Sequence, residues 1–253
     1  MIYNMVFSPT GGTLRAAEIL ADTFPGPVTQ IDLTDTSVDP QQHLFSSEDI
    51  CIAAVPSFGG RAPNAAIARL SRMQGNSARA VLLVAYGNRA YEDTLLELKN
   101  TLTDAGFHCV AAVAAIAEHS VMRQFASGRP DCQDEAELRS FGQRIWQALQ
   151  AGTDKAVSVP GNFPYRNYGG LPMKPKAGKS CTGCGLCAEK CPVGAISREA
   201  PDKTDPAACI TCMRCVSICP QHARKLNGLL VAAAAQMLKK ACGERKANEL
   251  FLD

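Results

Sequence analysis

The sequence IYNMVFSPTGGTLRAAEILADTF, from Ile2 to Phe24, contains three unlike parts. The apolar run Ile2–Phe7 is typical of a strand, and AAEILADTF has the spacing of an amphipathic helix. Between them, residues 8–13 combine two adjacent glycines with three hydroxyl side chains. A loop of this kind often binds a phosphate, because the free N–H groups and the dipole of a helix start favour an anion.

The alternation of strand and helix continues through the first 150 residues. Expected strands are Ile2–Phe7, Val28–Leu33, Ile50–Val55, Ala80–Tyr86 and Phe107–Ala115. Expected helices are Leu14–Thr23, Pro63–Met73, Tyr91–Ala105 and Gln133–Gln150. Strands that alternate with helices indicate βαβ units, and right-handed crossovers make the parallel sheet doubly wound. The sequence therefore predicts an α/β fold.

Three kinds of phosphate loop compete for residues 8–13. The P-loop requires a lysine that is missing here, and the dinucleotide fingerprint requires a third glycine, although Asp32 stands where a ribose-binding acid would. The loop resembles the flavodoxin motif [ST]-x-T-G-x-T. That resemblance implies an FMN phosphate held by Ser8, Thr10, Gly11, Gly12 and Thr13. A capped helix start with a glycine turn is the alternative without a ligand.

Charge and cysteine divide the chain into unlike parts. Residues 1–165 hold 12 basic and 17 acidic side chains, whereas residues 166–228 hold 10 and 4. Of the 12 cysteines, eight lie between Cys181 and Cys219. Such crowding, without a secretory start or a long apolar stretch, indicates metal ligands in a soluble, cytoplasmic protein.

The cysteines form an internal repeat. CTGCGLCAEKCP (Cys181–Pro192) and CITCMRCVSICP (Cys209–Pro220) both read C-x2-C-x2-C-x3-C-P. They resemble the ligand runs of bacterial two-cluster ferredoxins, in which the fourth cysteine ligates the other cluster. The expected ligand sets of two [4Fe–4S] clusters are Cys181, Cys184, Cys187 and Cys219, and Cys209, Cys212, Cys215 and Cys191. Two zinc sites are the alternative, which this spacing suits poorly.

The expected organisation has four parts. Residues 1–152 form a flavodoxin-like FMN-binding domain, 153–178 an aromatic-containing linker or wrapping segment, 179–228 the two-cluster domain, and 229–253 a C-terminal helix. Basic residues near the clusters either offset cluster charge and raise the reduction potential or form an ordinary solvated face. They are Lys174, Lys176, Lys179, Lys190, Arg214 and Arg224.

A doubly wound sheet binds its ligand beyond the carboxyl ends of its strands. The loops after the third and fourth expected strands should therefore meet a flavin ring. Their candidate contacts are Pro56, Ser57, Phe58, Gly59 and Gly60, and Tyr86, Gly87, Asn88, Arg89 and Tyr91. Packing is the alternative role of the aromatic residues, and solvation that of Arg89.

As a whole, the chain resembles a flavodoxin domain fused to a two-cluster ferredoxin domain, of the type called EFR1-family ferredoxins. The resemblance rests on SPTGGT, YGNRAYEDTLLEL, AEHSVM and both cysteine runs. It implies the strand order 2-1-3-4-5, a small ferredoxin-like α+β module, and FMN with two [4Fe–4S] clusters as cofactors.

The expected function is electron transfer between the clusters and FMN, which couples one-electron and two-electron redox partners such as a ferredoxin or a reductase. Whether the chain is also an enzyme stays open. The alternative is a flavin-dependent reductase of a quinone, a nitro compound or another unsaturated acceptor, with His119 beside Glu118 as a proton donor. A redox sensor that binds a partner protein is a third alternative. Neither a nucleic-acid partner nor a membrane span is expected.

Overall fold

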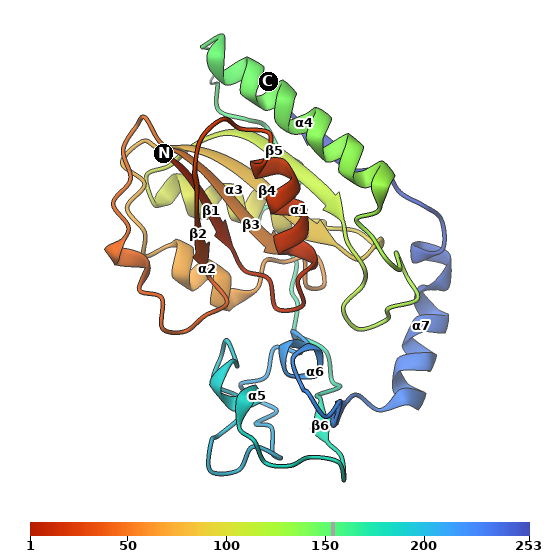
Figure 1. The fold of residues 1–253 in the computed structure, drawn as a ribbon. Coiled ribbons are helices and arrows are strands. Elements are labelled where there is room, and N and C mark those ends of the chain that lie inside the picture. The colour runs from red at the N-terminus through yellow and green to blue at the C-terminus, as the bar shows by residue number, and fades with distance from the viewer. Residues whose placement is uncertain (153–154) are drawn as a thin grey trace.

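A computed structural model describes residues 1–152 and 155–253, and its main body is a six-stranded sheet of order β2-β1-β3-β4-β5-β8 (Figure 1). Five strands are parallel, and β8 pairs antiparallel with β5. The strands are β1 (Ile2–Val6), β2 (Val28–Asp32), β3 (Ile50–Pro56), β4 (Arg79–Tyr86), β5 (His108–Ile116) and β8 (Glu249–Phe251). The predicted doubly wound fold with the order 2-1-3-4-5 is confirmed.

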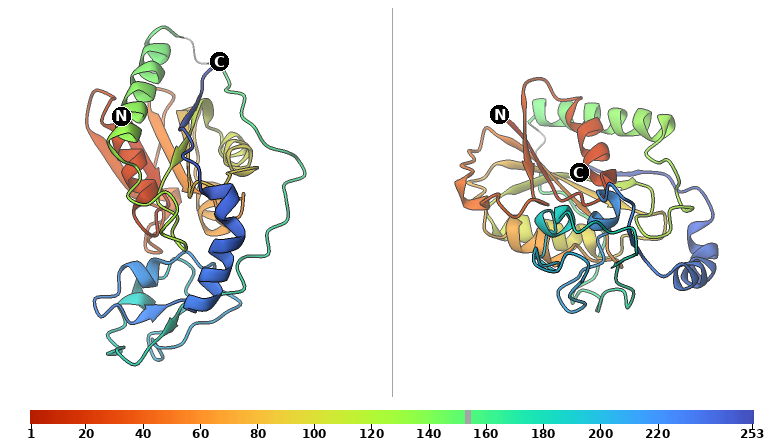
Figure 2. Two further views of the ribbon diagram at one scale, coloured as in Figure 1. Left: turned by 90° about the vertical axis from the view of Figure 1, so that its right-hand side faces the viewer. Right: turned by 60° about the horizontal axis from the view of Figure 1, so that its bottom comes forward.

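Helices cover both faces of this sheet, as Figures 1 and 2 show. Alternate strand residues point to opposite faces, so Met5 packs in one apolar core and Val6 in the other. The first core is closed by α2 (Asn64–Leu70) and α3 (Thr94–Asp104), and the second by α1 (Gly12–Ala21) and α4 (Cys132–Gln150). A short 3-10 turn, η1 (Pro40–Gln42), follows β2.

The small module lies below the end of the sheet from which the loops after β1, β3, β4 and β5 emerge (Figure 1). It contains a two-stranded antiparallel ribbon and two short helices. These elements are β6 (Lys176–Ala177), α5 (Leu186–Glu189), α6 (Arg214–Ser217) and β7 (Arg224–Lys225). The chain reaches the module along an extended linker and leaves it through α7 (Gly228–Cys242) (Figure 2).

The prediction of one helix across residues 229–253, and of a sheet with five strands, is wrong at the C-terminus. Helix α7 ends at Cys242, and Glu249–Phe251 forms the sixth strand. The reason is the open edge of β5, whose backbone groups need partners. Phe251 pairs with Ala112, and the side chain of Asn248 accepts a hydrogen bond from the Ile116 N–H at 2.8 Å.

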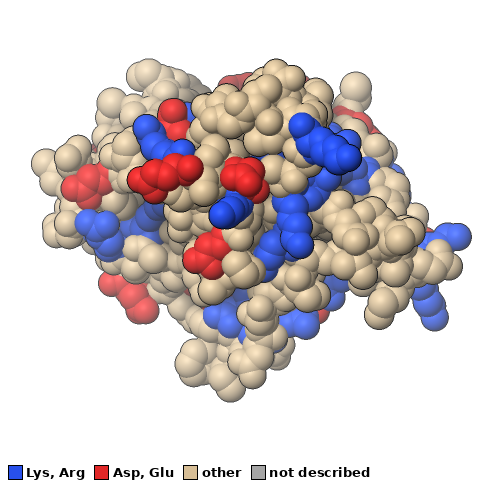
Figure 3. All heavy atoms as spheres, turned by 90° about the horizontal axis from the view of Figure 1, so that it is seen from below, with Lys and Arg blue, Asp and Glu red and all other residues tan. Residues whose placement is uncertain are grey.

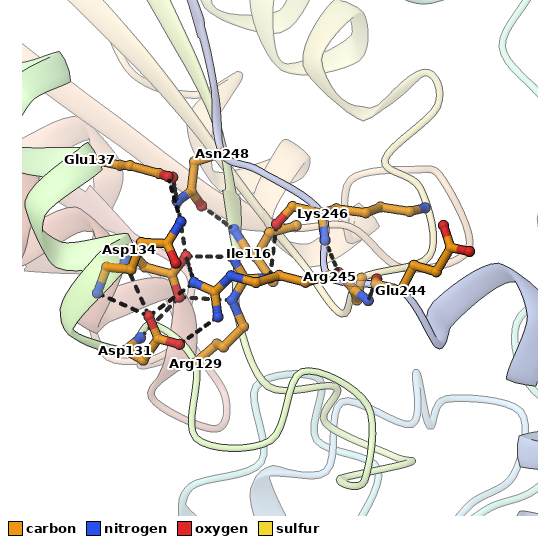
Figure 4. Close-up of polar contacts among 11 residues, drawn as sticks. Ile116, Arg129, Asp131, Asp134, Glu137, Glu244, Arg245, Lys246 and Asn248 are labelled. Atoms are coloured by element: carbon orange, nitrogen blue, oxygen red, sulfur yellow. Dashed lines mark hydrogen bonds and ion pairs between the residues drawn. The ribbon is translucent and has the colours of Figure 1, made fainter.

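Polar contacts fix the tail before it enters the sheet (Figure 4). Arg129 and Asp134 form an ion pair whose side chains are 5% and 0% exposed. Arg245 pairs with Asp131 at 2.6 Å, and Asn248 donates to Asp134 at 3.0 Å. The tail is therefore bound to the start of α4 as well as to β5.

Across residues 1–152 and 155–253, no helix combines the length and the apolar character that a membrane crossing requires.

Candidate functional site

A cavity lies at the carboxyl ends of the parallel strands. Loops after four strands and parts of the module and linker enclose it. Its lining includes Pro9, Thr10, Gly12 and Thr13, Pro56, Ser57, Phe58 and Gly59, Tyr86, Gly87, Arg89 and Ala90, 117–122, Tyr168, Leu171, Ile210, Thr211, Cys212 and Leu238. Strand-end loops and module residues thus face one space.

The first loop has the geometry of an anion site. Gly11, at φ 93°, turns the chain into α1, and no side chain caps the helix start at this residue. The Leu14 N–H donates to Ser8 Oγ at 2.9 Å, which leaves the hydroxyl hydrogen of Ser8 free to donate. The first N–H groups of a helix lack partners within it. An added Cβ at Gly12 would lie 3.1 Å from Ala117 Cβ, so glycine lets the loop after β5 come close.

The second and third loops bring Phe58, Tyr86 and Arg89 to the cavity. Gly59, at φ 60°, lies against the ring of Tyr168, because a Cβ there would be 2.2 Å from that ring. Burial raises the pKa of Tyr168, so the side chain stays a neutral phenol. A linker residue thus forms part of the wall where the sequence predicts ring contacts.

Five residues expected at the cofactor do not line this cavity: Ser8, Gly11, Gly60, Asn88 and Tyr91. Ser8 Oγ accepts from the Leu14 N–H at the start of α1, and Gly11 lines a neighbouring cavity. Asn88 donates to the carbonyls of Cys242 and Glu244 at 2.7 Å each, and Tyr91 donates to Glu249 at 3.0 Å. Asn88 and Tyr91 therefore hold the C-terminal tail, a role that no local sequence pattern indicates.

Arg89 and His119 line the cavity but already have partners. Arg89 pairs with Glu92 at 2.7 Å. His119 Nδ1 accepts from the N–H groups of Val121 and Met122 at 3.2 and 3.3 Å, and burial lowers its pKa. The imidazole is therefore neutral, and its remaining hydrogen is on Nε2.

Two smaller cavities lie inside the module. One is lined by the four cysteines Cys181, Cys184, Cys187 and Cys219. The other is lined by Cys191, Cys209, Cys212 and Cys215. The fold thus gathers the eight cysteines in the two crossed sets expected from the sequence. We call these spaces the outer and inner cavities.

The thiols of the two sets are chemically suited to bind metal. All twelve cysteines of the chain are free. Within the described residues, no three His, Cys, Asp or Glu side chains form a site for one metal ion. Burial raises the pKa of Cys212 to about 12 and that of Cys215 to about 11. Such thiols lose their protons when a metal binds them.

The inner cavity adjoins the large one. Ile210, Thr211 and Cys212 line both. Arg69 of α2 donates to the carbonyl of Pro192 at 2.7 Å, and Arg214 of the module donates to the carbonyl of Pro9 at 3.3 Å. Residues 210–212 therefore lie between the two cavities. The two hydrogen bonds hold the module against the sheet domain.

The linker also holds this arrangement, as its aromatic residues suggested. Asp93 at the start of α3 accepts from the N–H groups of Asn162 and Arg166 at 2.9 and 2.7 Å. Arg61 stacks on Tyr165 at 4.9 Å from the ring centroid. Sequence reasoning missed Tyr168 and residues 210–212 as cavity wall, because only folding brings them to the strand ends.

A comparison with known protein families identifies the module. Residues 180–224 match the family described as the 4Fe-4S dicluster domain, which confirms the expected two clusters. No curated protein matches the chain.

Several solved structures are similar to the sheet domain. A flavodiiron core from Synechocystis sp. is 20% identical over 60% of this chain and 35% of its own, with a TM-score of 0.41. A flavodoxin of Streptococcus pneumonia is 16% identical over 59% and 99%, with a TM-score of 0.42. The reduced flavodoxin of Megasphaera elsdenii is 16% identical over 58% and 100%, with a TM-score of 0.39. This chain thus spans about a third of the flavodiiron chain.

Proposed function

We propose that this chain, a flavodoxin-like domain joined to a 4Fe-4S dicluster domain, transfers electrons between two [4Fe–4S] clusters and FMN. The observation that carries the proposal is the position of Cys212, which lines both the inner cavity and the large cavity. A ligand of one cluster would then form the wall of the flavin site. FMN exchanges one or two electrons and each cluster one, so the chain would connect one-electron with two-electron partners.

The large cavity suits FMN for reasons that lie in its own residues. Thr10 and Thr13 present hydroxyls, and the start of α1 presents N–H groups, so a phosphate is bound without a lysine. Phe58, Tyr86 and Tyr168 supply flat apolar surface for a ring system.

The two sets of cysteines have different surroundings. The outer cavity is lined by module residues alone, and its ligand candidate Cys184 is exposed. The inner cavity contains the buried Cys191 and Cys212. The outer set therefore faces a redox partner protein, such as a ferredoxin or a reductase, and the inner set faces FMN. Free thiol ligands require a reducing compartment, which favours the cytoplasm.

Rapid mixing under anaerobic conditions tests this order. The protein, loaded with both cofactors, is mixed with a reduced ferredoxin while cluster and flavin absorbance are recorded. Flavin reduction should follow cluster reduction. Cys212→Ala should abolish flavin reduction, and Cys132→Ala, at an exposed cysteine outside both sets, should leave it unchanged. If the clusters of the unchanged protein are reduced and the flavin never is, the proposal is wrong.

A second candidate function is reduction of a small organic acceptor at the flavin. It is favoured by His119, which lines the large cavity with Nδ1 occupied and Nε2 as its only N–H. Turnover of a quinone or a nitro compound by the reduced protein, lowered by His119→Phe while FMN content is kept, would establish it. Without turnover, the chain is an electron carrier alone.

A further inference from the structure

The two cysteine runs differ at one buried position. Residues Cys191–Ile196 read CPVGAI and Cys219–Arg224 read CPQHAR, so Ile196 and Arg224 occupy equivalent places 28 residues apart. Ile196 is 5% exposed and lines the inner cavity. Arg224 is 2% exposed and lines the outer cavity. One half of the repeat thus places an apolar side chain where the other places a buried cation.

The contacts of Arg224 reach a candidate cluster ligand. Its Nε donates to Cys187 Sγ at 3.2 Å. Its terminal nitrogens donate to Thr204 Oγ1 at 2.8 Å, to the Lys203 carbonyl at 3.3 Å and to the Pro201 carbonyl. These three oxygens are neutral, so they satisfy the hydrogen bonds of the guanidinium but not its charge. A buried cation is stable only beside a compensating anion.

The outer cavity is where that anion would be. Four thiolates around iron and sulfide carry net negative charge, and Cys187 already accepts from the guanidinium. Figure 3 shows many further Lys and Arg side chains at the surface of the module's side of the molecule, where solvent screens them. Arg224 differs from them because it is excluded from solvent and bonded to sulfur.

The inner cavity is also lined by an arginine, Arg214, but its hydrogen bonds differ from those of Arg224. Arg214 lies between Cys212 and Cys215 and is half-buried. Its guanidinium donates to the carbonyl of Pro9 in the sheet domain, whereas Arg224 donates to a sulfur. At the inner set, Cys191 Sγ accepts from the Ala195 N–H at 3.3 Å, and Cys219 Sγ accepts equally from Ala223 in the outer set. The two sets thus have equivalent backbone donors, but only in the outer set does a charged side chain, Arg224, donate to a cysteine sulfur.

We infer that Arg224 makes the outer cluster the more easily reduced of the two. The inference rests on the proposed division of the cysteines. Reduction adds one negative charge to a cluster, and a buried cation bonded to a ligand sulfur stabilises that charge. The outer site therefore has the higher reduction potential, and an electron rests there in preference to the inner site. Transfer toward FMN then begins from the cluster that faces the partner.

Reductive titration followed by EPR tests the inference on the holoprotein. The unchanged protein should show two separate cluster midpoints, and Cys184→Ala should remove the higher one. Arg224→Ile, which copies Ile196, should lower that midpoint by at least a tenfold change in the reduction equilibrium, 59 mV for one electron, and move the other less. Lys225→Gln, which removes an exposed charge from the next residue, should change neither.

Several results would overturn the inference. They are an unchanged pair of midpoints in Arg224→Ile, a larger shift of the lower midpoint, or an equal shift in Lys225→Gln. If Arg224→Ile does not retain iron, Arg224→Gln decides, because it loses the charge and keeps an N–H donor. Its higher midpoint should fall, and an unchanged value refutes the role of Arg224. Flavin reduction in rapid mixing is recorded separately, so the proposed function can stand while this inference fails.

Discussion

The ion pair between Arg129 and Asp134 is where the C-terminal tail meets the sheet domain, and Arg129→Ala should destabilise that domain. Arg129 donates to Asp134 through Nε at 2.7 Å and to the Lys246 carbonyl at 3.0 Å. Its removal leaves a fully buried carboxylate without this cation. The loss of one member of a buried pair costs about 3–5 kcal/mol.

The remaining contacts of Asp134 place the effect at the lower end of that range. The carboxylate still accepts from the Asp131 N–H at 2.9 Å, from Asn248 at 3.0 Å and from Arg245 at 3.3 Å. We therefore expect the free energy of unfolding to fall by about 3 kcal/mol. For a protein of this size, that corresponds to a decrease in melting temperature of about 6–12 °C.

Trp146 is the assay for this change, because it is the single tryptophan of the chain and lies in α4. Its ring centroid is 5.9 Å from that of Phe24, so its fluorescence follows unfolding of the sheet domain in guanidinium chloride. Arg72→Ala is the matched control, because Arg72 pairs with Asp39 at 3.4 Å with both side chains exposed. The control should change stability by less than about 1 kcal/mol. An equally small effect of Arg129→Ala would refute the importance of the buried pair.

Three further predictions concern the cofactor sites and pH. Gly59→Ala should reduce the FMN released on denaturation, because the new Cβ would lie 2.2 Å from the Tyr168 ring. Cys184→Ala should lower iron per chain by about half, since each cluster contains four irons. Burial raises the pKa of Asp134, but its hydrogen bonds, first that from Arg129, outweigh this and lower it. The stability it contributes is thus complete above the unfolded pKa of about 3.9 and is lost as pH falls through the folded value.

Each of these has a matched comparison. Gly169→Ala changes a linker glycine with open space around it and should keep FMN. Cys132→Ala should keep all iron, and a loss of iron equal to that in Cys184→Ala would contradict the assignment of the outer set. The difference in unfolding free energy between the unchanged protein and Arg129→Ala should narrow on acidification below about pH 4. If this difference in unfolding free energy grows as the pH falls, the predicted direction is wrong.

The strands could be predicted closely because their sequences carry the signal locally. Ile50–Val55 and Ala80–Tyr86 are continuous apolar runs, and both are almost entirely buried in β3 and β4. The strand β8 could not be predicted, because Glu249–Phe251 is three residues long and becomes a strand only by pairing with β5. A short segment of this kind takes its structure from its partner.

The candidate site was predictable where spacing alone sets the geometry. The cysteine runs and the turn at Gly11 are local patterns. The fold gathers the cysteines around two cavities, and Gly11 precedes the first turn of α1. The wall of the large cavity was not predictable, because Tyr168 and Cys212 reach it only through the packing of the linker and the module. Asn88 is the opposite case. Its position in the loop after β4 predicts a contact with the cofactor, but its side-chain amide holds the C-terminal tail.

The strand β8 also changes how the module is attached. The chain leaves the sheet domain after α4 and returns to it at β8, so the module is an insertion held at both ends. Two tethers confine it to a small volume and keep its local concentration near the strand ends high. Cutting one connection by proteolysis would leave the other in place. An exchange of the module for a foreign dicluster domain would therefore have to rejoin the chain at both connections.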